Sequence, residues 1–354
     1  MGRDADIVVV GAGIAGVAAA RALAQGGRAV LLIEQFGLGH ARGSSHGSSR
    51  IFRLSYPDAR YVRLAGEALE GWRELEAECG ESLIAHTGAL DFGPVANENA
   101  RALSSCGIGH ELLRGKDVTA RWGLTAAPEE PALFQPDGGT MLADRAYAAF
   151  VAAARAAHGE VIEGVRVTGF DIGADSVCVR TEAGEIVALA AVVTAGAWAR
   201  GLLAPLGIEL AVVPTRETVA YFDVPDASQL PTVIDQAVHA DARDEQVWYA
   251  LAAPGIGLKA GLHHAGPPAD PDEIGVPDEK TVDRVADWVG GRYPGSRTAA
   301  AAPETCLYTT TADEGFILER HGRIVVGSAC SGHGFKFAPA HGRALAALAL
   351  DAAG

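Results

Sequence analysis

Residues 6–16 read Asp6-Ile7-Val8-Val9-Val10-Gly11-Ala12-Gly13-Ile14-Ala15-Gly16, and this stretch decides the fold. The four consecutive apolar residues before Gly11 predict a strand that is buried on both faces. Gly11 allows a tight turn, Gly13 leaves room for a pyrophosphate beside the backbone, and Gly16 lets the following helix pack closely on the strand. The stretch therefore indicates a turn that binds a dinucleotide.

A second apolar run, Leu31-Leu32-Ile33, leads into Glu34, 18 residues after Gly16. At this distance a carboxylate can accept hydrogen bonds from a ribose hydroxyl. The alanine-rich residues 18–24 predict the helix between the two strands. A glycine fingerprint alone is weak evidence, and a glycine-rich turn in an ordinary β-α unit is the alternative. The strand, the helix and the acid together favour a dinucleotide site.

The composition limits the classes of partner. The chain has 354 residues, 49% of them hydrophobic, which is enough for two domains or one large one. Its formal net charge of −15 argues against nucleic acid or an anionic membrane surface as a partner. An anionic substrate would therefore need a local cationic pocket. The longest apolar run, at residues 188–199, is too short to span a bilayer.

The cysteines and the N-terminus indicate a compartment. The five cysteines are scattered, odd in number and lack the spacing of a metal site. The first strand begins at residue 6 or 7, so no secretory leader is expected. A reducing cytoplasm is the simplest location for such a chain.

Periodicity and composition predict the elements along the rest of the chain. Helices are expected at 61–79, 142–158, 281–289 and 342–353. Strands are expected at 165–170, 177–180, 188–198 and 324–327, with a strand-rich stretch at 210–262. Residues 266–279, which are acidic and contain four prolines, predict a turn region. Residues 36–56 are rich in Gly, Ser, His and Arg, and predict a loop or a short helix close to a ligand.

The β-α order at both ends of the chain predicts an α/β fold in which one domain is built from the two ends and the other is inserted between them. The dinucleotide domain is expected to comprise residues 1–80, 140–210 and 300–354. The inserted domain, with a mixed or antiparallel sheet over the ligand, is expected to comprise residues 81–139 and 211–299.

Five separated segments resemble one known family, in the family's order along the whole chain. The resemblance is to the monomeric sarcosine oxidase and N-methyltryptophan oxidase group of the D-amino-acid-oxidase-like flavoproteins. The segments are residues 11–16 with Glu34, Gly43-Ser44-Ser45-His46-Gly47-Ser48-Ser49-Arg50-Ile51-Phe52-Arg53, Val193-Thr194-Ala195-Gly196-Ala197-Trp198, Cys306-Leu307-Tyr308-Thr309-Thr310-Thr311-Ala312-Asp313-Glu314 and Ser331-Gly332-His333-Gly334-Phe335-Lys336-Phe337. Residues 81–135 and 210–255 match the family poorly.

The resemblance implies FAD as the cofactor, held by a thioether between the flavin 8α-methyl group and Cys306. From the residues alone, a buried cysteine that packs as a small hydrophobe is the more ordinary interpretation. The cofactor contacts that the resemblance implies are Gly11, Gly13, Ile14, Gly16, Glu34, Ser44, Val167, Cys306, Gly334 and Lys336.

Three potential cations, His46, Arg50 and Arg53, are spaced by four and three residues, which would place them on one face if the segment were a helix. A solvated basic face is the alternative. The resemblance implies that His46 and Arg50 lie near the flavin ring and that Arg53 binds the substrate carboxylate, a role that its planar fork suits. Lys336 is the second candidate for that carboxylate, although from the residues alone it could be a surface lysine.

Lys259 lies between apolar residues, where a lysine usually extends toward solvent. The resemblance implies instead that it activates oxygen beside the flavin, since a fixed cation stabilises the charge that develops on O₂. His263 completes the family's Lys-x-x-x-His pattern and, with Tyr308, is expected in the catalytic group. Tyr249 is expected on the substrate side, with an ordinary core tyrosine as the alternative.

The chain is thus expected to be an FAD-dependent oxidase of a secondary amine, such as an N-methyl or cyclic amino acid, which forms an imine and reduces O₂ to H₂O₂. The alternatives are an oxidase of a cyclic imine acid or biosynthetic intermediate, and a dehydrogenase that uses another electron acceptor. A non-catalytic flavin- or NAD-binding protein is a further alternative, against which Lys259, Arg53 and Lys336 argue. No metal is expected. The sequence leaves the oligomeric state open, with a monomer compatible.

Overall fold

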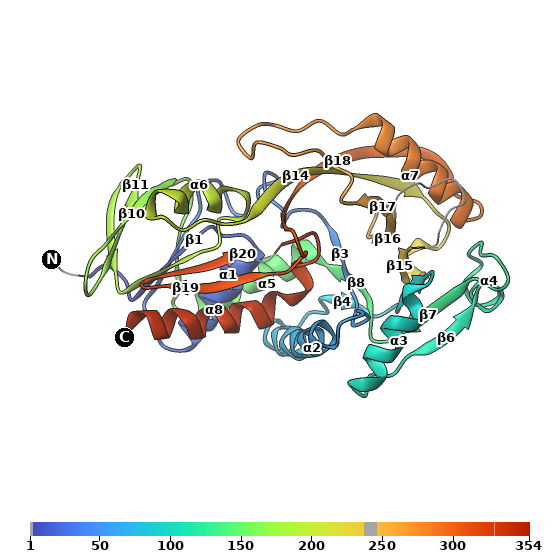
Figure 1. The fold of residues 1–354 in the computed structure, drawn as a ribbon, viewed down its shortest axis with the longest axis horizontal. Helices are drawn as coiled ribbons and strands as arrows, with labels where there is room; N and C mark the ends of the chain where they lie inside the picture. Colours follow the sequence, from blue (N-terminus) through green and yellow to red (C-terminus); the bar gives the residue numbers. More distant parts are fainter. Residues whose placement is uncertain (1–2, 237–245, 329) are drawn as a thin grey trace.

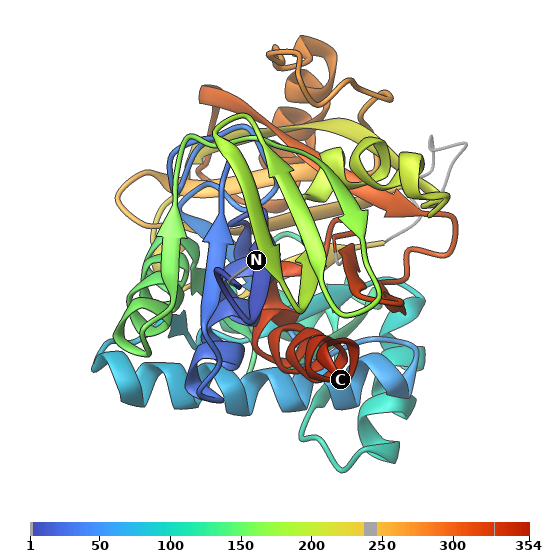
Figure 2. The same cartoon turned by 90° about the vertical axis from the view of Figure 1, so that its left-hand side faces the viewer.

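A computed structural model describes residues 3–236, 246–328 and 330–354 of the chain. The described residues form an α/β structure with a six-stranded sheet, an eight-stranded sheet and two three-stranded sheets. Figures 1 and 2 show the six-stranded sheet at the end that carries both termini and the larger sheet at the other end. The predicted fold class, a Rossmann-like sheet combined with a mixed sheet, is confirmed.

The six-stranded sheet contains the N-terminal motif at its centre. Its strands, in spatial order, are β19 (Ile317–His321), β20 (Ile324–Ser328), β13 (Ala190–Val193), β1 (Ile7–Val10), β2 (Val30–Ile33) and β9 (Glu160–Ile162). All neighbours pair in parallel except β19 with β20. Strands from both ends of the chain therefore pair in one sheet, as the sequence predicts.

The two faces of this sheet are covered by different layers, which explains why its strands are apolar throughout. Ile7 and Val9 of β1 face the helices α1 (Ile14–Gln25), α5 (Ala143–Ala156) and α8 (Ala338–Ala353). Val8 and Val10 face a small antiparallel sheet. That sheet consists of β10 (Val167–Ile172), β11 (Val177–Thr181) and β12 (Gly184–Ala188).

Helices α1 and α8 touch at their backbones. A Cβ added at Gly342 of α8 would lie 2.6 Å from the carbonyl carbon of Ala18 in α1. The C-terminal helix is thus packed directly on the helix that follows the glycine turn.

The eight-stranded sheet is mixed, because β15 and β5 pair in parallel while the other neighbours are antiparallel. Its strands, in order, are β18 (Arg297–Thr311), β14 (Val212–Asp223), β17 (Gly257–His263), β16 (Val247–Ala253), β15 (Thr232–Asp235), β5 (Ala89–Phe92), β7 (Pro131–Gln135) and β6 (Glu111–Arg114). The long strands β14 and β18 run side by side toward α7 (Glu279–Arg292) in Figure 1. The remaining helices are α2 (Ala59–Cys79), α3 (Val95–Ser105), α4 (Gly115–Trp122) and α6 (Ala199–Leu203).

The helical interpretation of residues 46–53 is wrong. Residues Ser49–Phe52 form a strand, β3, which pairs with β8 (Gly139–Leu142), and β4 (Ile84–Ala85) completes this small sheet. Gly47 has φ +100°, which a helix does not allow. The Arg50 guanidinium donates to the carbonyls of Ser44 and His46 at 2.8 and 2.5 Å, and so holds the preceding loop in place.

The other predicted elements lie close to their expected positions. The four predicted helices correspond to α2, α5, α7 and α8, and the strand-rich stretch contains β14 to β17, although its residues 237–245 lie outside the described ranges. The domain boundaries stay a prediction. In the described ranges, no helix has both the length and the apolar character that a bilayer crossing requires.

Candidate active site

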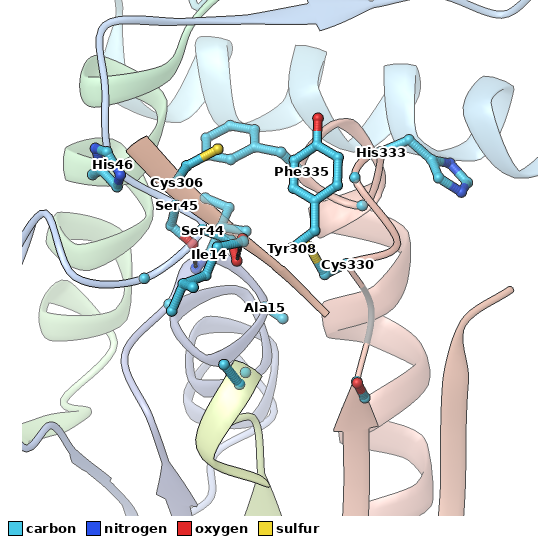
Figure 3. A pocket seen from close by; sticks show the side chains of 18 of the residues that line it. Ile14, Ala15, Ser44, Ser45, His46, Cys306, Tyr308, Cys330, His333 and Phe335 are labelled. Atoms are coloured by element: carbon cyan, nitrogen blue, oxygen red, sulfur yellow. Dashed lines mark hydrogen bonds between the residues drawn. The ribbon is translucent and has the colours of Figure 1, made fainter. Parts of the chain in front are cut away.

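A single large cavity of about 1150 Å³ lies where the two larger sheets meet the loop after β2. Figure 3 shows Ile14 and Ala15 of α1, the loop residues Ser44 to His46, Cys306 and Tyr308 of β18, and Phe335 around this cavity. It is lined by the predicted site residues Gly11, Gly13, Ile14, Glu34, Ser44, His46, Arg50, Arg53, Val167, Tyr249, Lys259, His263, Cys306, Tyr308, Gly334 and Lys336. The structure thus brings together residues from very different parts of the sequence.

The glycine turn has the geometry that a dinucleotide needs. Gly11 has φ +93°, and a Cβ there would lie 2.7 Å from the Thr194 carbonyl oxygen. Gly16 does not line the cavity; a Cβ there would lie 2.0 Å from the Gly11 carbonyl oxygen, so this glycine permits the close helix–strand packing that was predicted. Helix α1 begins after Gly13 without a side-chain cap, which leaves a helix N-terminus facing the cavity.

Glu34 follows β2 directly, and its side chain is buried. Its carboxylate accepts hydrogen bonds from the backbone N–H of Ala12 at 2.8 Å and of Phe36 at 2.9 Å. Burial alone would raise the pKa of Glu34, but hydrogen bonds from His40 and from these two N–H groups lower it below its usual value. A carboxylate has about four acceptor positions, so it retains capacity for a ribose hydroxyl.

The cavity therefore fits the two polar parts of a dinucleotide. The start of α1, where the N-cap residue Gly13 has no side chain to accept from the backbone N–H groups, faces a position suited to the pyrophosphate, and the ionised Glu34 suits the ribose. The buried Nε2 of His46 has no hydrogen-bond partner among the described residues, and it also lines the cavity. A ligand bound in the cavity would supply the missing hydrogen-bond partner of this nitrogen.

His46, Arg50 and Lys259 form one group on the cavity wall. Burial, followed by the charges of Arg50 and Lys259, lowers the pKa of His46 to about 4, so this histidine is neutral near pH 7. Burial, followed by the charge of Arg50, lowers the pKa of Lys259 to about 8. The Lys259 Nζ lies 5.9 Å from the centre of the Tyr221 ring, and this side chain is only 6% exposed. Lys259 does not extend to solvent.

Arg53 and Lys336 form a second cationic group, which Tyr56 joins. The Arg53 guanidinium carbon lies 4.2 Å from the centre of the Tyr56 ring, and the Lys336 Nζ donates to the Tyr56 hydroxyl at 3.0 Å. Lys336 also donates to the His333 carbonyl at 2.8 Å and is buried, so it is not a surface lysine. Burial, followed by the charge of Arg53, lowers the pKa of Lys336 well below its usual value.

Cys306 lies on β18, paired in register with Glu217 of β14. Burial raises the pKa of its thiol, although the charges of Arg50 and Lys259 act in the opposite direction. The neighbouring residue Leu307 accepts a hydrogen bond through its carbonyl from the Ser44 hydroxyl. This contact ties the loop after β2 to the strand that carries the thiol.

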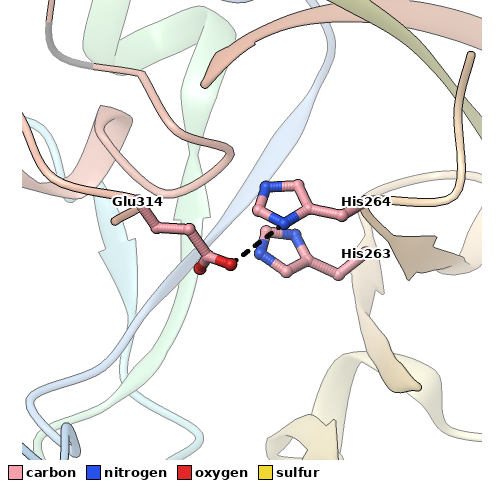
Figure 4. Close-up of side chains that lie close together, drawn as sticks. All are labelled: His263, His264 and Glu314. Carbon is pink, nitrogen blue, oxygen red and sulfur yellow. Dashed lines mark ion pairs between the residues drawn. The ribbon is translucent and has the colours of Figure 1, made fainter. Parts of the chain in front are cut away.

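His263 lies at the end of β17 beside His264, and the two rings stack 3.9 Å apart with an angle of 22° (Figure 4). Nδ1 of His264 forms an ion pair with Glu314 at 3.2 Å, which raises the pKa of His264, whereas burial lowers the pKa of His263 to about 3. Each of the three side chains has one atom of a type that ligates metals, and these atoms lie within 4.8 Å of one another. Nearly parallel rings cannot both direct a lone pair at one ion, so we assign an ion pair rather than a metal site to this group.

The cavity also contains residues that the sequence analysis did not assign. The Ser45 hydroxyl accepts from the backbone N–H of Ile14 at 3.0 Å, and Tyr56 lies between the two cations of the second group. Behind the cavity wall, Asp91 of β5 does not line the cavity but is fully buried 3.6 Å from Arg53. An acid within the apolar strand Ala89–Phe92 is the only sequence signal for Asp91, and no pattern distinguishes Ser45 or Tyr56 from their neighbours.

Known proteins resemble the chain over nearly its full length. The family of FAD dependent oxidoreductases (DAO) matches residues 6–348. A monomeric sarcosine oxidase of Bacillus sp. (strain B-0618) is 34% identical over 99% of this chain and 93% of its own. The N-methyl-L-tryptophan oxidase of Yersinia pestis (strain Pestoides F) is 29% identical over 98% and 95%. The solved open form of NikD, an unusual amino acid oxidase essential for nikkomycin biosynthesis, is 29% identical over 99% and 95%, with a TM-score of 0.88.

Proposed function

Because this chain belongs to the family of FAD-dependent oxidoreductases, we propose that its cavity oxidises the CH–NH bond of a secondary amino acid, such as an N-methyl or cyclic one. FAD held in this cavity would take up a hydride equivalent from the carbon next to nitrogen, which leaves the imine, and would pass the two electrons to O₂, which leaves as H₂O₂. The resemblance predicted from the motifs is confirmed at the level of family and reaction class.

The observation that carries this proposal is the pair of separate cationic groups in one cavity. Arg53 and Lys336, linked by Tyr56, bind the substrate carboxylate, since a guanidinium fork and an ammonium group together suit a carboxylate. Lys259 stands in the other group, beside Arg50 and the neutral His46, and stabilises negative charge that develops on dioxygen. Tyr249 and Tyr308 complete the wall on the substrate side.

We assign the cofactor contacts to the glycine turn, Glu34, Ile14, Ser44, Val167 and Gly334. The helix start receives the pyrophosphate and Glu34 the ribose. We also assign a thioether between Cys306 and the flavin 8α-methyl group. The support for it is that Cys306 lines the cavity, close enough to Arg50 and Lys259 for their charges to lower its pKa against the effect of burial.

Replacement of Cys306 by serine is expected to release the flavin on acid precipitation. The wild-type precipitate should be yellow, whereas the variant should leave its colour in the supernatant. Cys330→Ser is the matched control, because Cys330 also lines the cavity and should leave the flavin in the precipitate. A yellow precipitate from Cys306→Ser would contradict the thioether.

The rate of amine oxidation is expected to rise with pH, because an ammonium group must lose its proton before the neighbouring carbon can give up a hydride. His46 and His263, with pKa values lowered to about 4 and about 3, stay neutral from neutral to alkaline pH and do not cause this rise. The measurement is the anaerobic loss of visible flavin absorbance after mixing with substrate. A flat pH profile for this step would contradict the requirement for a neutral amine.

A panel of N-methyl, cyclic and primary amino acids, scored for H₂O₂ release and for anaerobic flavin reduction, tests the activity. Reduction without H₂O₂ release would favour a dehydrogenase with another acceptor. Turnover of cyclic imine acids alone would favour the biosynthetic alternative.

We also propose a cytoplasmic location. The support is that all five cysteines, each in a described part of the chain, are free thiols.

A further inference from the structure

A buried carboxylate faces the proposed carboxylate-binding cations. Asp91, on β5 of the eight-stranded sheet, is 0% exposed, and its Oδ1 lies 3.6 Å from Nη1 of Arg53. Its Oδ2 accepts a hydrogen bond from Nδ2 of the equally buried Asn99 at 3.0 Å. Asp91 does not line the cavity, so it acts on a ligand only through Arg53.

Burial of an ionised carboxylate is costly unless a cation and hydrogen bonds compensate for the lost hydration. Burial raises the pKa of Asp91 above its usual value, and the charge of Arg53 and the hydrogen bond from Asn99 offset only part of this shift. Nη1 of Arg53 is the atom that lies nearest Asp91, and it donates a hydrogen bond to the Ser55 carbonyl. Arg53 also lines the cavity.

The net positive charge of the Arg53–Lys336 pocket is therefore limited. Arg53 and Lys336 contribute up to two positive charges, and Asp91 contributes one negative charge 3.6 Å from Arg53. A bound carboxylate favours the charged form of the buried Lys336, because an opposite charge nearby raises the pKa of an ammonium group. The net positive charge of the pocket then balances one substrate carboxylate, and a second carboxylate on the same substrate has no counter-charge.

We propose that Asp91 is a specificity-determining residue, which sets the charge of the Arg53–Lys336 pocket so that it accepts substrates with one carboxylate and discriminates against dicarboxylates. The inference rests on the proposed function, since it takes Arg53 and Lys336 as the carboxylate site. Asp91 pairs with Arg53 and does not line the cavity, so it acts through Arg53 and is not a catalytic residue.

The test compares two anions of nearly equal size in the FAD-loaded enzyme: malonamate, with one carboxylate, and malonate, with two. Their dissociation constants are measured from the change in visible flavin absorbance and from competition with the amine substrate. The wild-type enzyme should bind malonamate at least as tightly as malonate. Asp91→Asn should shift the ratio of the two constants toward malonate by about tenfold or more, because one buried negative charge is removed.

A control variant separates the buried charge of Asp91 from acidic groups at the cavity edge. Asp58→Asn removes such a group, which lies in an exposed ion pair with Arg60, and screening should keep the change in the ratio below about twofold. An asparagine still caps helix α2 at this position.

An unchanged ratio in Asp91→Asn would overturn the inference while leaving the proposed function intact. If neither anion binds the wild-type enzyme or competes with the amine, the carboxylate site itself fails, and with it the proposed function. If Asp91→Asn does not fold, the two anions are compared in the wild-type enzyme alone. Malonate binding more than about tenfold tighter than malonamate would then overturn the inference, because it would show that Asp91 does not offset the positive charge of the pocket.

Discussion

Lys259→Met is expected to slow the reaction of the reduced enzyme with O₂ by about 10²- to 10³-fold, the usual effect of removing one preorganised electrostatic group. The Lys259 ammonium is held in a buried position beside the Tyr221 ring, where it is worth more than in water. Methionine has similar length and no charge. Anaerobic reduction by the amine should change only a few-fold, because Arg53 and Lys336 are untouched. Stopped-flow absorbance measures the two steps separately.

The matched control is Lys280→Met on the exposed first turn of α7, which should leave both steps unchanged. Equal slowing of both steps in Lys259→Met would contradict a role with dioxygen, and would assign Lys259 to the amine instead.

The same variant has a stability signature in the cofactor-free protein. Burial lowers the pKa of Lys259 from 10.5 to about 8, so between these values the unfolded chain binds more protons than the folded one. The free energy of unfolding should therefore rise with pH across this window, and the methionine variant should lack that rise. At pH 7 the variant should be more stable by up to about 3 kcal/mol. Urea unfolding at several pH values measures both effects.

Arg292→Met is expected to lower the free energy of unfolding by about 3–5 kcal/mol, because it removes the cation that lies against the buried Asp235 and the largely buried Glu130. Arg292, near the end of α7, contacts Asp235 at 2.6 Å and Glu130 at 2.8 Å, and its side chain is only 7% exposed. It also donates to the Thr125 carbonyl at 2.7 Å and lies 4.1 Å from the centre of the Phe92 ring. The guanidinium thus joins α7, β15 and the segment before β7.

Urea unfolding of Arg292→Met and Arg292→Lys separates charge from geometry. Lysine keeps the charge but not the fork, so it should recover only part of the loss. Asp235→Asn combined with Arg292→Met should be more stable than Arg292→Met alone, since one buried charge is removed. A loss below about 1 kcal/mol, typical of exposed ion pairs, would contradict the assignment. Because Ile234 and Gln236 line the cavity, substrate affinity should fall together with stability.

The N-terminal unit could be predicted from the sequence because its signals are local. Apolar strands, glycines at fixed offsets and Glu34 each act within about one β-α-β unit, and the structure has them as predicted. The motifs near Cys306 and Lys336 indicated the family, and these residues line the cavity. Their roles in catalysis stay predictions.

Of the two interpretations of residues 36–56, a loop or a short helix, the helical one is wrong for a physical reason. The spacing of His46, Arg50 and Arg53 fits a helix, but Gly47 and the hydrogen bonds of Arg50 to backbone carbonyls favour a loop and a strand. The three residues then separate into two groups, with Arg53 beside Lys336. The pairing of Arg53 with Asp91 depends on contacts between distant segments, which no local pattern encodes.

The contact of α1 with α8 has a consequence for biosynthesis. The glycine turn precedes Phe335, Lys336 and the helix that supports α1 by more than 300 residues, so it leaves the ribosome well before them. Until these residues follow, the nascent chain lacks one wall of the cavity and β20, one of the two parallel partners of β13. Cofactor capture is therefore a late event, and a chain stalled before β20 would be a target for chaperones or proteases rather than a partly active enzyme.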